Sequence, residues 1–426
     1  MSRLDSGNNK TLVGFLKEVS CALLLLNLVM GSTIAAQAQG SETSLSQPQT
    51  TEITIHAPTT VAEPPSSSTV PLLPVGQVRE QENPPLSKEL GIPLYMWDDG
   101  TDSPKAIIVA FHGLTFHGKV YKELGKRLAQ DGYLVVAPEM RGYGRWYYCS
   151  KNGGAHTKDC GHVTAKTRLP KITSLPKTKE NKTTYSQRVC KRANYKQSLN
   201  DFTALLKRLH QEYPGLMLYC IGESLGADMA VRLASTSGQL VDGLILASPA
   251  IKKQGILRRS LIPESAKMMF NPAREINVRP YLENCLSEDK RIVNERAQDP
   301  YVRKGLSLLE LLSTQKTTKE TLTYIPNISP NTPVLIIQGT DDRIIKANGV
   351  VLILERLRAK DQTVRWFDNR GHVLLETAYI QPDTWSTITD WLTEHLAAAS
   401  NKKVQSGIQT ALEVDPKTKT APPVEP

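Results

Sequence analysis

The stretch LYCIGESLGADMA, residues 218–230, places one serine between two glycines where an apolar run gives way to a helical pattern. G-x-S-x-G at a strand-to-helix turn is the pattern of a nucleophile elbow. The turn is so tight that its flanking positions tolerate almost no side chain, and Gly222 and Gly226 meet that demand. Ser224 is therefore predicted to project above a sheet at the amino end of a helix, where the dipole favours a developing negative charge.

A serine hydroxyl is a weak nucleophile that needs a base, and the base needs an orienting acid. Downstream of Ser224, the apolar run in PVLIIQGTDDRII ends in Asp341 and Asp342, and VRWFDNRGHVLLE carries His372 after a glycine. The order serine, acid, histidine is typical of catalytic triads whose serine lies in such an elbow. We predict Ser224 as nucleophile and His372 as base, with Asp342 preferred to Asp341 as the acid.

An oxyanion hole needs two backbone N–H donors. The amide of Leu225, directly after the serine, is the first candidate. The second is the amide of Leu114 in the loop FHGLTFHG, where Gly113 lets the chain turn closely over the site. We expect His112 to brace this loop rather than to take part in proton transfer.

The elements that must position these residues are short apolar runs that alternate with helical patterns. Runs that are apolar throughout are typical of strands in a parallel sheet covered on both faces. Their alternation with helices predicts an α/β fold with a mostly parallel central sheet. The predicted strands are 106–112, 133–138, 216–222, 244–248 and 333–339.

Two stretches interrupt this alternation after predicted strands, and we interpret them as cap insertions over the site, because ligands bind at the carboxyl ends of parallel strands. The first, 146–192, is basic and contains cysteines, and the second, 251–324, is a lid. The whole folded domain is predicted to span 87–400. The segments 39–86, rich in Ser, Thr and Pro, and 401–426 are predicted to be a disordered linker and tail.

Residues 1–38 have the features of a secretory signal peptide: basic residues, the short apolar run CALLLLNLVM and a final A-x-A. Cleavage is expected after Ala38, giving an exported protein. The alternative is an uncleaved N-terminal membrane anchor.

Cysteines in polar stretches of an exported protein are candidates for disulfides. We expect Cys149 to pair with Cys160, and Cys190 with Cys285. An oxidising compartment favours a disulfide over a zinc site at Cys149 and Cys160, so no metal is predicted.

The net charge of +10 indicates an anionic surface or substrate. With only 6% aromatic residues and no stripe of aromatic and basic residues, a nucleic-acid module is excluded. The basic insertion 146–192 is a candidate for contact with phosphate headgroups or an anionic membrane surface.

Five stretches together resemble the α/β-hydrolase family, most closely its serine hydrolases that include monoacylglycerol lipases and lysophospholipases. They are FHGLTFHGKVYKELGKRLAQDGYLVVAPEMRGYGRW, CIGESLGADMA, GLILASPAI, PVLIIQGTDDRII and NRGHVLL, and the resemblance covers about residues 90–400 apart from the two insertions. It implies Ser224, Asp342 and His372 as the triad, with the acid three residues after Gly339. Where lipases of this group carry Gly-Glu-His, this chain has Thr115-Phe116-His117.

The sequence thus predicts an exported serine hydrolase that cleaves carboxylic esters through an acyl-enzyme, without metal or organic cofactor. Its expected substrate is a lipid or other small-molecule ester, as in lysophospholipases and monoacylglycerol lipases. Two alternatives stay open. The same triad also serves a peptidase, amidase or acyltransferase, and the fold also suits a catalytically silent protein that binds an anionic surface.

Overall fold

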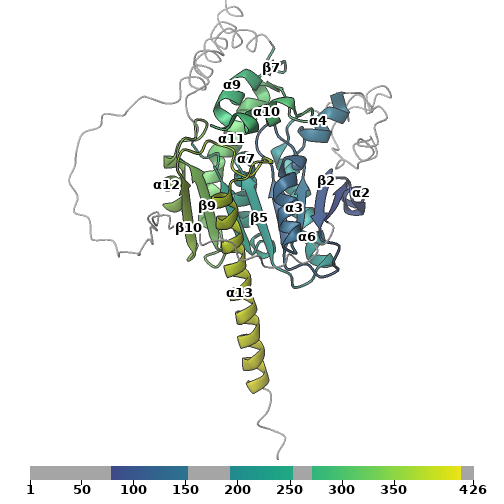
Figure 1. Cartoon of the computed structure of the whole chain (residues 1–426), viewed down its shortest axis with the longest axis vertical. Helices are drawn as coiled ribbons and strands as arrows, with labels where there is room; N and C mark the ends of the chain where they lie inside the picture. Colours follow the sequence, from purple (N-terminus) through teal and green to yellow (C-terminus); the bar gives the residue numbers. More distant parts are fainter. Residues whose placement is uncertain (1–77, 152–191, 253–270, 414–426) are drawn as a thin grey trace, which may run out of the picture.

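The computed structural model describes residues 78–151, 192–252 and 271–413. Their central feature is an eight-stranded sheet with the order β1-β2-β4-β3-β5-β6-β9-β10 (Figure 1). The first two strands run antiparallel to their neighbours, and all pairs from β4 to β10 are parallel. The strands are β1 (Arg79–Glu82), β2 (Leu94–Asp98), β3 (Ile107–Phe111), β4 (Leu134–Pro138), β5 (Leu218–Glu223), β6 (Gly243–Ala247), β9 (Val334–Gly339) and β10 (Gln362–Phe367).

Helices cover both faces of this sheet, because successive side chains of each strand point to opposite sides. In β3, Ile107 and Val109 belong to a core shared with α6, α7 and α12, whereas Ile108 and Ala110 belong to a core shared with α3 and α13. Burial on both faces explains why these strands are apolar throughout, and the predicted fold is confirmed. The helices are α2 (Pro85–Leu90), α3 (Lys122–Gln130), α4 (Gly144–Lys151), α6 (Tyr195–Glu212), α7 (Leu225–Thr236), α12 (Asn348–Leu354) and α13 (Pro382–Glu413).

Each of the five predicted strands corresponds to an observed one, β3, β4, β5, β6 or β9, with ends within two residues. The prediction of a linker over 39–86 is wrong at its end, since β1 and the start of α2 fall inside it. The sequence of β1 is REQE, which has no apolar signal, because an edge strand is fixed by backbone pairing with β2. An ion pair between Arg79 and Asp98 of β2, at 2.6 Å, adds to that pairing.

The predicted disordered tail, 401–426, is also wrong in part, because α13 continues to Glu413 and projects beyond the sheet in Figure 1. Its last turns contain helix-favouring Ala, Lys, Gln and Leu, and the first proline after them is Pro416. The predicted signal peptide 1–38, the rest of the linker and residues 414–426 lie outside the described residues. None of the helices described is both long and apolar enough to cross a membrane.

The segment predicted as a lid lies between β6 and β9 and forms a small cap above the sheet (Figure 1). Residues 253–270 of this segment, and 152–191 of the first insertion with its basic residues, lie outside the described ranges. The cap contains β7 (Glu275–Asn277), α9 (Arg279–Leu286), α10 (Lys290–Gln298), β8 (Gly305–Ser307) and α11 (Leu308–Tyr324).

Arg303 fastens the cap to the loop that follows β3. Its side chain, 0% exposed, pairs within the cap with Glu310 at 2.6 Å and Glu275 at 3.1 Å, and donates to the carbonyl oxygen of Gly142, after β4, at 3.0 Å. Its backbone N–H donates to the carbonyl oxygen of Thr115 at 2.8 Å. The two carboxylates compensate the buried charge, and the bonds to Thr115 and Gly142 join the cap to the loops after β3 and β4.

Packing of α3 against β2 depends on Gly125, where a Cβ would lie 2.4 Å from the buried indole ring of Trp97. We expect Gly125→Ala to lower the free energy of unfolding by about 1–3 kcal/mol, because the methyl group overpacks the interface. Urea denaturation measures this loss. Gly238→Ala is the matched control, since no atom lies within 4 Å of its Cβ position. Equal losses in the two variants would contradict this packing.

Candidate active site

Ser224 occupies the single-residue turn between β5 and α7. Its backbone has φ 56° and ψ −119°, a left-handed conformation that costs a non-glycine residue free energy. Its N–H donates to the carbonyl oxygen of Ala247, at the end of the neighbouring strand β6, at 2.9 Å. The side chain therefore lies at the carboxyl edge of the parallel sheet, at the amino end of α7.

The two glycines beside Ser224 are required by close backbone approach. A Cβ on Gly222 would lie 2.3 Å from the backbone of Gly226. A Cβ on Gly226 would lie 1.7 Å from the carbonyl oxygen of Phe111, at the end of β3. No side chain fits at either position, which is the steric demand that the sequence pattern predicts.

His372 and Asp342 lie in contact at the same edge. Asp342 follows β9 and His372 follows β10, and the two loops touch: a Cβ on Gly339 would lie 2.3 Å from the carbonyl oxygen of Arg370. The distance from His372 Nδ1 to Asp342 Oδ2 is 2.8 Å. Asp341, the alternative acid, has a side chain that is 48% exposed and pairs with Arg343 instead.

The carboxylate of Asp342 is held by further donors. Its Oδ1 accepts the backbone N–H groups of Ile344 and Ile345, each at 2.8 Å, and its Oδ2 accepts the side-chain amide of Gln338 at 2.9 Å. These contacts fix the carboxylate in the position where it meets the imidazole. Gln338 was missed by the sequence analysis, because it lies inside an apolar strand.

His372 and Asp342 each shift the pKa of the other. Burial lowers the pKa of the His372 imidazole, but the charge of Asp342, its hydrogen bond and the charge of Glu223 outweigh burial, so that the pKa is raised above 6.5. Burial raises the pKa of Asp342, but the His372 charge and hydrogen bonds outweigh it and leave the pKa lowered. Asp342 is therefore ionised at neutral pH and holds the proton of His372 on Nδ1.

The loop after β3 lies against Ser224, since a Cβ on Gly113 would be 3.5 Å from Ser224 Cβ. The buried imidazole of His112 braces this loop: its Nε2 accepts the N–H of Met140 at 3.0 Å, so its Nδ1 donates to the carbonyl oxygen of Gly113 at 2.9 Å. Burial lowers the pKa of His112 to about 3, which keeps the ring neutral in this role.

The predicted oxyanion donors, the amides of Leu114 and Leu225, belong to this loop and to the first residue of α7. Because a trans peptide directs its C=O and N–H to opposite sides, the bond from His112 to the Gly113 carbonyl also sets the direction of the Leu114 N–H. Within the ranges described, neither amide donates to another protein group.

Two buried carboxyl groups at the site, those of Glu223 and Glu376, were missed by the sequence analysis. Glu223 accepts the backbone N–H groups of Leu374 and Glu376, at 2.6 and 2.8 Å, and Glu376 accepts the N–H of Gly113 at 2.6 Å. The available signal was a charged residue inside the apolar stretches LYCIGE and HVLLE. These contacts fasten the loop of His372 to the elbow that carries Ser224.

The cap also supports the histidine. The carbonyl oxygen of Leu286, at the end of α9, accepts the backbone N–H groups of His372 and Val373, at 3.0 and 2.9 Å. The carboxylate of Glu288 accepts the N–H of Gly371 at 2.6 Å. The cap segment after α9 is therefore part of the structure that positions the imidazole.

The predicted disulfide between Cys190 and Cys285 is wrong, because Cys285 has a free thiol. Position 285 is in helix α9 rather than in a loop, and its charged neighbours are Arg343 and Asp342. Burial raises the pKa of this thiol. The predicted pairing of Cys149 with Cys160 lies outside the residues whose side chains are described.

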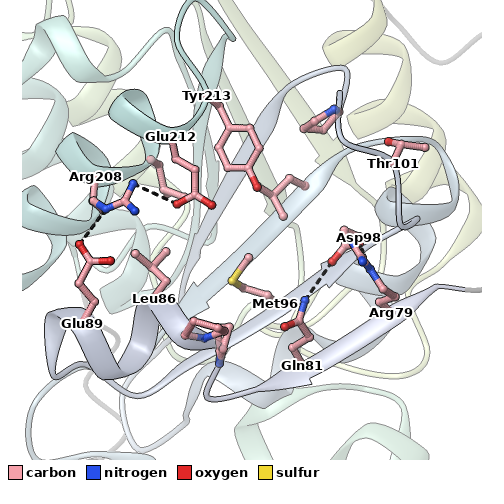
Figure 2. Close-up of a pocket in the computed structure, with 15 residues that line it drawn as sticks. Arg79, Gln81, Leu86, Glu89, Met96, Asp98, Thr101, Arg208, Glu212 and Tyr213 are labelled. Carbon is pink, nitrogen blue, oxygen red and sulfur yellow. Dashed lines mark hydrogen bonds and ion pairs between the residues drawn. The ribbon is translucent and has the colours of Figure 1, made fainter.

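A separate pocket of about 230 Å³ lies between β1, β2 and the end of α6 (Figure 2). It is at the amino edge of the sheet, since Leu134, the first residue of β4, lines it. Its charged groups are paired with one another: Arg79 with Asp98, and Arg208 with both Glu89 and Glu212. This pocket is on the opposite edge from Ser224 and takes no part in the site.

The perturbed imidazole gives a direct test. We expect an NMR titration of His372 to give a pKa above 6.5, and Asp342→Asn to lower it, because the charge that favours the imidazolium is removed. Asp341→Asn is the control and should leave the titration unchanged, since Asp341 faces solvent. An unchanged pKa in Asp342→Asn would show that the pair is not formed in solution.

The family model described as serine aminopeptidase, S33, matches residues 102–165 and 185–377. Human monoglyceride lipase is 23% identical over 304 residues, 70% of this chain and 86% of the lipase. The monoacylglycerol lipase of Mycolicibacterium smegmatis is 21% identical over 71% of this chain and 92% of its own length. The crystal structure of Paleococcus ferrophilus monoacylglycerol lipase matches 71% of this chain and 99% of its own, with TM-score 0.52 and 20% identity. Since the family model covers more than half of the sequence, this chain belongs to the Hydrolase_4 (serine aminopeptidase, S33) family and has the α/β-hydrolase fold.

Proposed function

We propose that this protein is a serine hydrolase that cleaves carboxylic esters through an acyl-enzyme on Ser224. The observation that carries this proposal is the 2.8 Å contact of His372 with Asp342 at the sheet edge where a strained turn presents Ser224. Nucleophile, base and orienting acid are the three groups that such chemistry requires.

In this proposal the Nδ1–H of His372 donates to Asp342, which leaves the Nε2 lone pair available to take the Ser224 proton. The serine oxygen attacks the ester carbonyl carbon, and the imidazolium returns the proton to the departing alcohol oxygen. Water then attacks the acyl-enzyme and gives one proton to His372, which passes it back to Ser224 as the acid leaves.

The tetrahedral intermediate carries a negative charge on the former carbonyl oxygen. We assign the amides of Leu114 and Leu225 as its two donors, because the braced loop and the helix start hold both beside Ser224. Such preorganised donors stabilise the charge without any rearrangement at the moment of reaction.

The proposed substrates are lipid esters of the lysophospholipid or monoglyceride kind. The relatives named as monoglyceride and monoacylglycerol lipases, 21–23% identical to this chain, support a lipid ester. Peptidase, amidase or acyltransferase activity would use the same triad, so a matched substrate panel has to separate them. We expect a glycerol ester and a lysophospholipid of equal acyl length to be cleaved faster than an aminoacyl anilide. Faster cleavage of the anilide would overturn the ester assignment.

We expect Ser224→Ala to abolish labelling by a fluorophosphonate probe and to lower kcat on a short-chain nitrophenyl ester by about 10⁴-fold or more, because the attacking oxygen is lost. Gel fluorescence and absorbance assays measure the two effects. Ser235→Ala, on the same helix α7, is the matched control and should be labelled like the wild type. A folded wild-type protein that resists the probe would contradict the proposed function.

A further inference from the structure

The two buried carboxyl groups at the site have no place in the triad. Glu223 is 0% exposed and Glu376 is 1% exposed. A carboxyl group in such a position is costly unless hydrogen bonds compensate it. The backbone partners that compensate these two belong to the loops that carry the predicted catalytic groups.

Glu223, the residue before Ser224, holds the histidine loop, residues 370–378. Its Oε1 accepts the N–H of Leu374 at 2.6 Å, and its Oε2 accepts those of Leu375 at 3.2 Å and Glu376 at 2.8 Å. Three consecutive donors bound to one carboxylate fix the direction of the chain two residues beyond His372.

Glu376 continues this connection to the oxyanion loop, residues 112–115. Its Oε1 accepts the N–H of Gly113 at 2.6 Å, and its Oε2 would lie 2.9 Å from a Cβ at that glycine. The carbonyl of the same glycine is held by His112 at 2.9 Å. Both peptide groups of Gly113 are thus fixed, and the second of them carries the N–H of Leu114.

The charged and titratable groups that face Glu376 come from three other elements: Glu223 of β5, Tyr121 of the 3-10 helix η1 (Gly118–Tyr121) and Arg296 of α10. Burial raises the pKa of both carboxyl groups, and the charge of Glu223 raises that of Glu376 further. The bond from the Gly113 N–H, the charge of Arg296 and the hydroxyl of Tyr121 lower the pKa of Glu376 by less. His372 and the three backbone donors act the other way on Glu223. The pKa of Glu376 is raised further than that of Glu223, so Glu376 is the member of the pair that binds a proton first.

We propose that Glu223 and Glu376 are positioning residues that form a buried clamp, in which the elbow orients the histidine loop and that loop orients the oxyanion donor at Leu114. This inference rests on the proposed function of Ser224. A neutral Glu376 suits the role, because a negative charge beside the oxyanion hole would oppose the charge of the tetrahedral intermediate.

The test compares Glu376→Leu with Glu376→Gln. In Glu376→Leu no acceptor remains for the Gly113 N–H, and we expect kcat to fall about 10- to 100-fold with KM changed less than about threefold, somewhat below the loss of a whole oxyanion donor. Glu376→Gln keeps a neutral acceptor and should restore kcat to within several-fold of the wild type. In the wild type kcat should decline as the pH rises through the pKa of Glu376, which burial and the charge of Glu223 raise, and Glu376→Gln should lack this decline.

Asp201→Asn, which breaks a buried ion pair with Arg141 on another face of the sheet, is the matched control for loss of a buried acid. It should lower the melting temperature without changing the pH profile or the ratio of kcat to KM. Glu223→Gln tests the other half of the clamp. The charge of Glu223 raises the pKa of His372. The acid limb of the kcat/KM profile of Glu223→Gln should therefore lie at lower pH than that of the wild type.

Wild-type kcat and pH dependence in Glu376→Leu would overturn the clamp. If that variant does not fold, as judged by circular dichroism, Glu376→Gln decides, and a pH profile identical to the wild type overturns the inference. Fluorophosphonate labelling is measured in every variant. An unlabelled wild type refutes the proposed function itself, whereas a labelled wild type with an unaltered Glu376→Leu refutes the clamp alone.

Discussion

The whole site depends on how closely the first turn of α7 approaches the end of β3. With only 1.7 Å between the position of a Gly226 Cβ and the Phe111 carbonyl oxygen, the chain has to reverse within one residue after β5. That reversal forces the positive φ of Ser224 and places the loop after β3 against its side chain. The strain of the turn is offset by the buried sheet on which it stands, since β3 and β5 are paired along their whole length.

Apolar packing builds this sheet but does not orient the loops at its edge, because the hydrophobic effect has no direction. Directional bonds to three buried carboxyl groups do so instead. Asp342 fixes its own loop and the imidazole, Glu223 fixes the chain after His372, and Glu376 fixes Gly113. Hydrogen bonds contribute about 1.5–3 kcal/mol each at a charged carboxylate such as that of Asp342, and about 0.5–1.5 kcal/mol at a neutral carboxyl group such as that of Glu376. An unpaired buried partner costs about 1–3 kcal/mol, so these bonds favour the observed arrangement of the loops.

The sequence predicted the sheet, the turn at Ser224 and the contact of His372 with Asp342, because each has a local signal: an apolar run, two glycines around a serine, and an acid and a histidine after successive strands. It did not predict β1, because REQE has no apolar pattern, nor the end of α13, which was interpreted as a polar tail. The prediction of a disulfide at Cys285 was wrong because the spacing of cysteines in a sequence does not reveal which thiols meet in the fold. Glu223 and Glu376 bind partners 151 and 263 residues away, a distance over which local pattern says nothing.

The cap does more than cover the site, because it also holds two of the loops that form it. It accepts the N–H groups of His372 and Val373 through Leu286, and it binds the loop after β3 through Arg303. His117 of that loop also pairs with Asp299 after α10, at 2.9 Å. A motion of the end of α9 away from the sheet would break the bonds of Leu286 to His372 and Val373. In the proposed function, the position of α9 is therefore one of the conditions that place the imidazole of His372 beside Ser224.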